Sequence, residues 1–176
     1  MSALPADFTA TVLVVLHISA TGPTVLPDIL SRAGALPARH PEDGEPLAQG
    51  TILVAAPDRH LAVAGNQARL LTSPPDRGHR PSADVLLRSA ADAFGAACCG
   101  IVLSGTMDDG AAGLAAVRQA GGLAMVQDPA EAEFPGMPQA AIDAADPQVV
   151  ARVPELAGRV CAWVAERGGE TVPRQR

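Results

Sequence analysis

The sequence predicts an α/β domain of the doubly wound type, in which a mostly parallel sheet lies between two layers of helices, three layers in all. Three observations lead to this fold class. Apolar runs of strand length alternate with segments of helical period, which is typical of βαβ units. The alternating segment 61–71 is interrupted by Gly65-Asn66, which predicts one small antiparallel hairpin. The length of 176 residues suits one domain with a single core.

The first half of the chain contributes two of the parallel strands. Residues 12–16 are an apolar run that predicts a buried strand ending on His17. Residues 23–33 have the period of a short helix, and Gly34 ends it. Residues 51–55 predict the next strand, so this half supplies a strand, a helix and a strand before the hairpin.

The second half continues the alternation. Ser82 predicts the N-cap of a helix that runs to about Phe94, with Asp84 near its positive end. A Gly121-Gly122 pair suits a left-handed helix end. The tail, residues 168–176, is expected to be disordered. The other expected elements are a strand at 98–105, a helix at 111–120, a strand at 123–128, a helix from about Pro138, a strand at 148–153 and a helix at 154–167.

Composition argues against several classes of function. No apolar run reaches the roughly 18 residues of a membrane span, and no leader pattern is present, so we expect a cytoplasmic protein without membrane insertion. The formal net charge is −6 and the 13 basic residues are scattered, which argues against nucleic acid as a partner. The three cysteines have neither disulfide nor metal-ligand spacing.

Two predicted strand ends carry titratable residues. His17 directly follows residues 12–16, and Asp108 and Asp109 follow the strand at 98–105. Ligands of open parallel sheets bind beyond the carboxyl ends of the strands, so we expect these side chains at one edge. A carboxylate that orients a histidine is two-thirds of a nucleophilic triad, because it sets the tautomer and stabilises the imidazolium.

Each of these residues also has a structural interpretation. His17 alone fits a partly buried histidine that bonds a backbone carbonyl. Asp109 fits the N-cap of a helix that begins at Gly110, and Asp108 fits the same role. A metal or phosphate site is the third alternative for the two aspartates, but they are adjacent rather than convergent and no phosphate-binding glycine loop accompanies them.

Two motifs carry a family resemblance. "LSGTMDDGAAGL" and "QDPAEAEFPGMPQAA" occur in the order and register of the catalytic domain of chemotaxis protein-glutamate methylesterases, often called CheB-type, and the resemblance covers residues 4–167. It implies a parallel α/β domain that hydrolyses glutamate methyl esters on chemoreceptors through a Ser-His-Asp triad, without metal or cofactor. It also implies a receiver or signalling partner in trans, since no receiver domain precedes the resemblance.

The resemblance assigns roles to individual residues. His17 matches the family's catalytic histidine, and Asp109 matches its aspartate. Further positions match family motifs as well, and for most of them the alternative is an ordinary polar loop residue or a residue at a helix start. The further positions that match or lie in motifs beside the family's substrate cleft are His60, His79, Arg80, Thr106, Met107 and Met137.

The family's nucleophilic serine lies in a "GAS-x-GG" turn after its first strand, and no segment here matches that turn. "MSALPADF" resembles the end of the first family helix. Ser19 and Ser104 lack the strand-turn-helix context of a nucleophile. We therefore expect a domain that is incomplete at its N-terminus, lacks the first family strand and derives from a start codon assigned too late in a longer gene.

Three hypotheses follow for function. The first is an esterase whose upstream segment supplies the serine, with His17 as the base. The second is a non-catalytic remnant or receptor-binding module of the same family. The third is a nucleotide-binding module, which the missing glycine-rich fingerprint argues against.

Overall fold

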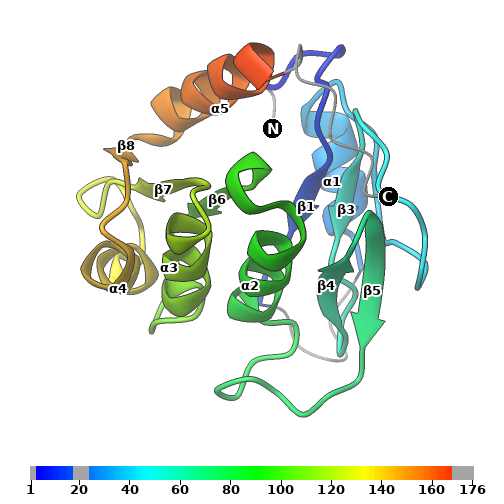
Figure 1. Ribbon diagram of the computed structural model, residues 1–176, viewed down its shortest axis with the longest axis horizontal. Helices are drawn as coiled ribbons and strands as arrows, with labels where there is room; N and C mark the ends of the chain where they lie inside the picture. The colour runs from blue at the N-terminus through cyan, green and yellow to red at the C-terminus, as the bar shows by residue number, and fades with distance from the viewer. Residues whose placement is uncertain (1–2, 18–23, 168–176) are drawn as a thin grey trace.

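The computed structural model describes residues 3–17 and 24–167 (Figure 1). Its parallel strands lie between helices on both faces, and one antiparallel hairpin stands apart from them. The predicted fold class, a mostly parallel three-layer α/β domain with a small hairpin, is confirmed. The tail 168–176 lies outside the described residues.

The first sheet has three parallel strands in the order β1-β3-β2. They are β1 (Val12–Val14), β2 (Ala38–Arg39) and β3 (Ile52–Val54), and Val12 lies opposite Ile52. β3 is fully buried between its neighbours. β1 is only half-buried, which corrects the expectation of a buried strand, because within the described residues it pairs with β3 alone. Helix α1 (Leu26–Ala33) connects β1 to β2.

The hairpin forms as the sequence predicts. Strands β4 (His60–Ala64) and β5 (Gln67–Leu71) pair antiparallel, and Ala64 faces Gln67 across the turn at Gly65-Asn66. Gly65 has a φ of 57°, a conformation that a two-residue hairpin turn requires and glycine adopts without strain. Helix α2 (Ala83–Phe94) packs on the hairpin, followed by a 3₁₀ turn, η1 (Gly95–Ala97).

The second sheet has the order β6-β7-β8 and is also parallel. Its strands are β6 (Cys99–Val102), β7 (Leu123–Gln127) and β8 (Val149–Ala151). Helices α3 (Ala111–Gln119) and α4 (Gly136–Ala145) cover one face, and α5 (Val153–Arg167) covers the other (Figure 1).

The helix ends largely agree with the sequence. The Ser82 side chain accepts a hydrogen bond from the N–H of Val85 and so caps α2, and Gly121 has the left-handed φ of 81° that ends α3. α1 begins at Leu26, later than predicted, and residue 23 lies outside the described residues.

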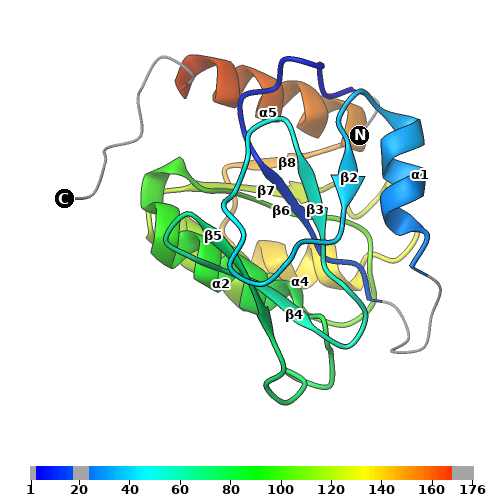
Figure 2. The same cartoon turned by 90° about the vertical axis from the view of Figure 1, so that its right-hand side faces the viewer.

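The two sheets lie side by side without strand pairing between them. In the described ranges β1 pairs only with β3, and β6 pairs only with β7, although both views place β1 beside β6 (Figures 1 and 2). A core cluster of buried side chains joins β3, the hairpin, α2 and Val117 of α3, a helix that covers the second sheet. In the described part of the chain, no helix combines the length and apolar character needed to cross a membrane.

Candidate active site

The carboxyl ends of β1 and β6 bring the two predicted residues together. Nε2 of His17 lies 2.6 Å from Oδ2 of Asp109, a hydrogen bond between positions 92 residues apart. The aspartate side chain is 2% exposed and the histidine side chain is 29% exposed. The predicted proximity of His17 and Asp109 is therefore confirmed, and the imidazole is the solvent-facing member of the pair.

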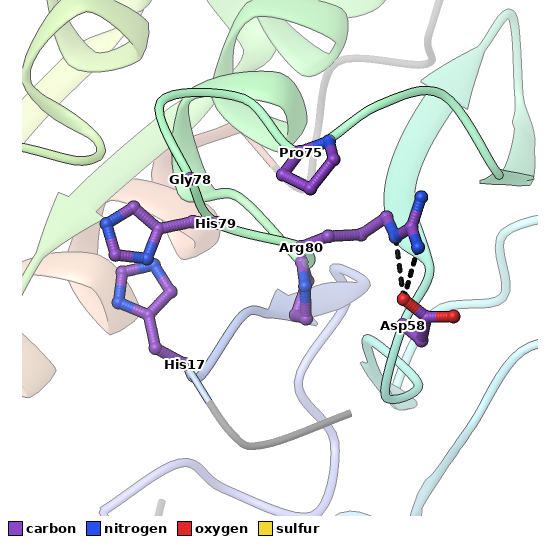
Figure 3. Close-up of a pocket in the computed structure, with 7 residues that line it drawn as sticks. His17, Asp58, Pro75, Gly78, His79 and Arg80 are labelled. Atoms are coloured by element: carbon purple, nitrogen blue, oxygen red, sulfur yellow. Dashed lines mark hydrogen bonds and ion pairs between the residues drawn. The ribbon is translucent and has the colours of Figure 1, made fainter. Parts of the chain in front are cut away.

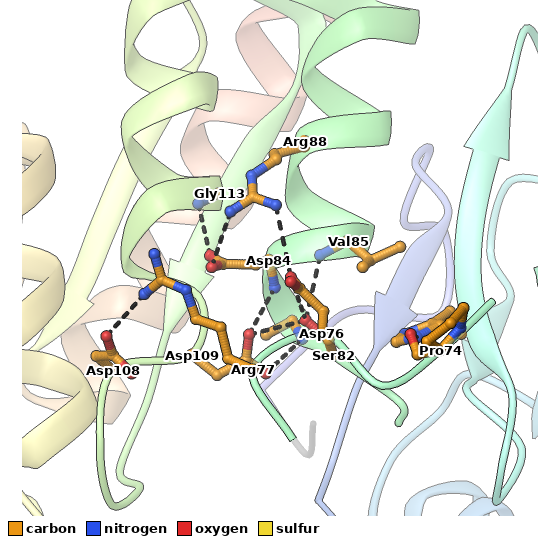
Figure 4. Close-up of polar contacts among 12 residues, drawn as sticks. Pro74, Asp76, Arg77, Ser82, Asp84, Val85, Arg88, Asp108, Asp109 and Gly113 are labelled. Carbon is orange, nitrogen blue, oxygen red and sulfur yellow. Dashed lines mark hydrogen bonds and ion pairs between the residues drawn. The ribbon is translucent and has the colours of Figure 1, made fainter. Parts of the chain in front are cut away.

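Asp109 binds the first turn of α2. Its Oδ1 accepts hydrogen bonds from the Ser82 hydroxyl at 2.9 Å and from the N–H of Asp84 at 3.0 Å, and its Oδ2 accepts the N–H of Ala83 at 2.7 Å (Figure 4). The helix that follows it starts from Gly110 with a φ of 93° and has no side-chain cap. The interpretation of Asp109 as the cap of its own helix is wrong, because the turn at Gly110 directs the carboxylate to α2.

These contacts keep Asp109 ionised. Burial opposes the charge, but the hydrogen bonds from His17, from the N–H groups of Asp84 and Ala83 and from Ser82 outweigh it and hold the pKa of the carboxyl well below its usual range. A helix N-terminus also favours a negative charge at this position. Asp109 is therefore an anion that can stabilise a positive charge on His17.

The hydrogen bond also determines which imidazole nitrogen is free. An ionised carboxylate has no proton to donate, so the shared proton lies on Nε2 of His17. Nδ1 then holds the lone pair and is the atom that can accept a proton from a reacting group.

A pocket of about 270 Å³ opens beside the imidazole (Figure 3). One wall is the His79 ring, which stacks on the His17 ring with centroids 4.3 Å apart and planes 19° from parallel. Arg80 forms an ion pair with Asp58 and donates to the carbonyl of Ser73 at 3.0 Å. The residues that line the pocket are His17, Asp58, Pro75, Gly78, His79, Arg80 and Pro81.

His60 lies elsewhere. Its side chain is fully buried, and Nε2 donates to the carbonyl of Pro74 at 3.2 Å. A side chain with no exposed surface cannot contact a substrate, so we leave His60 out of the proposed site. It supports the start of the loop that carries His79 and Arg80.

The loop after β6 lies next to the start of α4. The N–H of Gly105 donates to the carbonyl of Phe134 at 2.9 Å, and the N–H of Met137 donates to the carbonyl of Gly105 at 2.8 Å. Thr106 and Met107 are exposed, whereas the Met137 side chain packs directly against Gly105. None of the three predicted residues, Thr106, Met107 and Met137, lines the pocket beside His17.

Asp108 forms an exposed ion pair with Arg77 at 2.7 Å. Asp84 is buried and accepts the N–H of Gly113 at 2.6 Å; burial raises the pKa of Asp84, and the hydrogen bond from Gly113 and the charge of Arg88 oppose that rise. Across the described ranges, no three His, Cys, Asp or Glu side chains converge to hold a metal.

Sequence reasoning missed Asp58 and Ser82 as parts of this site. Asp58 has a φ of 56°, which a single sequence does not reveal, and it holds Arg80 at the pocket wall. Ser82 was predicted only as a helix cap. The helix that it caps also supplies two N–H groups to Asp109.

The fold and the site define a class: an α/β domain with a histidine–aspartate pair at the carboxyl ends of its parallel strands. The chain belongs to the CheB methylesterase family, whose family model matches residues 1–160.

Relatives and one solved structure agree with this family. The chain is 38% identical to protein-glutamate methylesterase/protein-glutamine glutaminase 4 of Myxococcus xanthus, over 96% of this chain and 48% of that protein. It is 40% identical to protein-glutamate methylesterase/protein-glutamine glutaminase 3 of Anaeromyxobacter dehalogenans, over 93% of this chain and 48% of that protein. The chain thus spans about half the length of the curated relatives that it matches.

The fold matches the crystal structure of the Thermotoga maritima CheB methylesterase catalytic domain. The TM-score is 0.82 and the sequence identity 24%, and the match covers 91% of this chain and 87% of that one. At this identity the likeness concerns the fold.

Proposed function

We propose that this chain supplies the histidine and aspartate of a Ser-His-Asp triad that hydrolyses methyl esters of glutamate side chains on methylated chemoreceptors. The observation that carries the proposal is the 2.6 Å hydrogen bond from His17 to a buried, ionised Asp109. Membership of the CheB methylesterase family and the names of the relatives supply the substrate class.

In the proposed mechanism His17 is the general base and Asp109 orients it. Nδ1 of His17 accepts the proton of a serine hydroxyl while the serine oxygen attacks the ester carbonyl. His17 then returns the proton to the departing methoxide, and methanol leaves. Water attacks the resulting glutamyl ester with His17 again as base, which frees the carboxylate and the serine. This chemistry uses no metal ion or cofactor.

The serine is the group that the described residues do not supply. Within residues 3–17 and 24–167, no serine hydroxyl forms a hydrogen bond with His17. The proposal of hydrolysis therefore requires a serine from outside the described residues. For the 176-residue form we expect no measurable release of methanol, because the described residues place no serine hydroxyl on His17 and a triad without its nucleophile retains little catalysis.

The experiment compares the extended and the 176-residue chains with methylated receptor as substrate and methanol release as the readout. In the extended chain, His17→Ala and Asp109→Asn should each lower kcat by about 10³- to 10⁴-fold. Arg69→Gln is the matched control. Arg69 lies on hairpin strand β5, and the change breaks only its exposed ion pair with Asp43, so kcat should be unchanged.

Near-normal turnover in either site variant would refute the assigned roles. A stop codon upstream, before any strand with a Gly-Ala-Ser-x-Gly-Gly-like turn, would overturn hydrolysis by an extended chain. The alternative is then a module that binds methylated receptor without hydrolysing it, which binding of the 176-residue chain to receptor vesicles measures directly.

The same proposal covers the setting of the domain. It assigns residues 4–167 to one methylesterase domain in the cytoplasm, with a receiver or signalling protein acting in trans. The family match over residues 1–160 supports the domain bounds.

A further inference from the structure

We propose that His79 is a positioning residue for His17: its ring holds the imidazole of His17 in the plane that faces Asp109. The two rings stack with centroids 4.3 Å apart and an angle of 19° between their planes (Figure 3). The inference rests on the proposed function only where it treats His17 as the base. The stacking itself belongs to the geometry of the chain.

His17 needs a second contact because one hydrogen bond does not fix a ring plane. Asp109 is held from several directions by Ser82, Ala83 and Asp84, so it keeps its place whether or not the imidazole is bound. The His17 side chain is 29% exposed and its Cβ–Cγ torsion has a broad range, so the ring can turn away from Asp109 and break their single hydrogen bond. A stacked ring on one face stops that rotation and leaves the edge with Nδ1 free.

The backbone around His79 forms a tight turn that fixes the position of its ring. Asp76 and His79 exchange two backbone hydrogen bonds of 3.0 and 2.9 Å, which closes a tight turn. Within it Arg77 has a φ of 47° and Gly78 a φ of 89°. Arg77 then reaches Asp108 at 2.7 Å (Figure 4), so the turn is attached to the same loop that carries Asp109.

The turn and the loop after β6 therefore hold the His17–Asp109 pair from two sides. The loop places the carboxylate at one edge of the imidazole, and the turn places His79 over its face. Aromatic pairs of this kind change a conformational equilibrium by about two- to tenfold. That is enough to shift the share of His17 rings that face Asp109.

The test observes the His17 ring nitrogens by NMR in the ¹⁵N-histidine-labelled 176-residue chain, with no substrate. In the wild type we expect one tautomer, with the proton on Nε2. His79→Ala should lower the ratio of Nε2–H to Nδ1–H by about two- to tenfold. His79→Phe keeps a ring and should restore the wild-type ratio, whereas His79→Asn keeps only polarity and should resemble alanine.

Arg69→Gln is the control, because it removes an exposed ion pair with Asp43 and leaves the turn of His79 untouched. It should keep the wild-type ratio. The proposal is overturned if asparagine restores the ratio and phenylalanine does not, if alanine has no effect, or if Arg69→Gln lowers the ratio as much as alanine. Thermal unfolding of each variant shows whether it is folded.

The proposed function has a separate readout. A ring-dependent tautomer ratio in a chain whose extended form shows no hydrolysis would support the positioning role and contradict the methylesterase proposal. The reverse result, hydrolysis that persists in His79→Ala with unchanged kcat, would count against His79 alone.

Discussion

At the scale of single residues, Asp109 links the site to the fold. Its carboxylate accepts hydrogen bonds from two backbone N–H groups at the N-terminus of α2 and also orients His17. One side chain therefore serves both stability and the proposed chemistry. An asparagine cannot replace it, because the amide nitrogen would face at least one N–H group as a second donor.

We expect Asp109→Asn to lower the free energy of unfolding at pH 7 by about 2–4 kcal/mol, since hydrogen bonds to a buried charge are lost. Because the pKa of Asp109 is lower in the folded than in the unfolded chain, its stabilisation is complete above the unfolded value near pH 4. It is lost progressively as the pH falls below that value. Urea unfolding at pH 7, 5 and 3 should show the two chains converging at acid pH.

Asp108→Asn is the matched control, with the same chemical change one residue earlier. Its ion pair with Arg77 is exposed on both sides, so its loss should cost less than about 1 kcal/mol. If both variants lost the same free energy of unfolding, burial and the N–H groups of α2 would contribute nothing particular at Asp109.

The sequence predicted this pair but not its surroundings. The position of both residues after predicted parallel strands was enough to place His17 and Asp109 close together, although the two strands lie in separate sheets. Whether a histidine in a loop faces solvent depends on which other segments cover it, and nothing local distinguishes the buried His60 from the stacked His79.

At the scale of elements, α2 and α3 approach so closely that only glycine fits between them. A Cβ on Gly113 would lie 2.6 Å from Cβ of Leu87 and 3.0 Å from Cα of Asp84. The same residue donates its N–H to the buried Asp84. The spacing of these helices matters for the site because Asp109 directly precedes the start of α3 and accepts hydrogen bonds from the first turn of α2.

We therefore expect Gly113→Ala to destabilise the fold by about 1–3 kcal/mol, because the added methyl group meets backbone and stem atoms that cannot move freely. Gly158→Ala in α5 is the matched control: nothing lies within 4 Å of its added Cβ, so helix propensity should stabilise the chain by about 0.5–1 kcal/mol. Thermal unfolding gives both values, and the same sign for both would contradict the proposed close contact.

Most elements were predictable because apolar runs and glycine or serine at helix ends are local signals. The strands at 51–55, 98–105 and 123–128 were found, but each is shorter in the structure, since pairing ends where the neighbouring strand ends. β2 was missed because two residues, Ala38 and Arg39, carry no apolar pattern and become a strand only beside β3.

At the scale of the whole molecule, the parallel strands form two separate sheets in the described ranges. The N–H of Val12 donates to the carbonyl of Thr51, and the carbonyl of Val14 accepts from Ala55. Strand geometry then directs the N–H of Leu13, between them, to the open edge. The sequence showed the strands but not this division, because no single segment encodes which edges pair.

We expect the Leu13 amide to exchange with deuterium on the order of 100-fold faster than the amide of Val12 in native-state NMR experiments. Met125 is the control, because β7 is paired on both sides. Equal protection at Leu13 and Val12 would show that this edge is paired in solution.

The division into two sheets has a consequence for the site. His17 extends from the sheet of β1 and Asp109 from the sheet of β6, so their hydrogen bond spans a boundary that no backbone ladder crosses in the described ranges. Sliding one sheet against the other by about 1 Å would break that bond while leaving every strand pair intact. The reactive geometry thus depends on how the two sheets pack against each other and not on strand pairing alone.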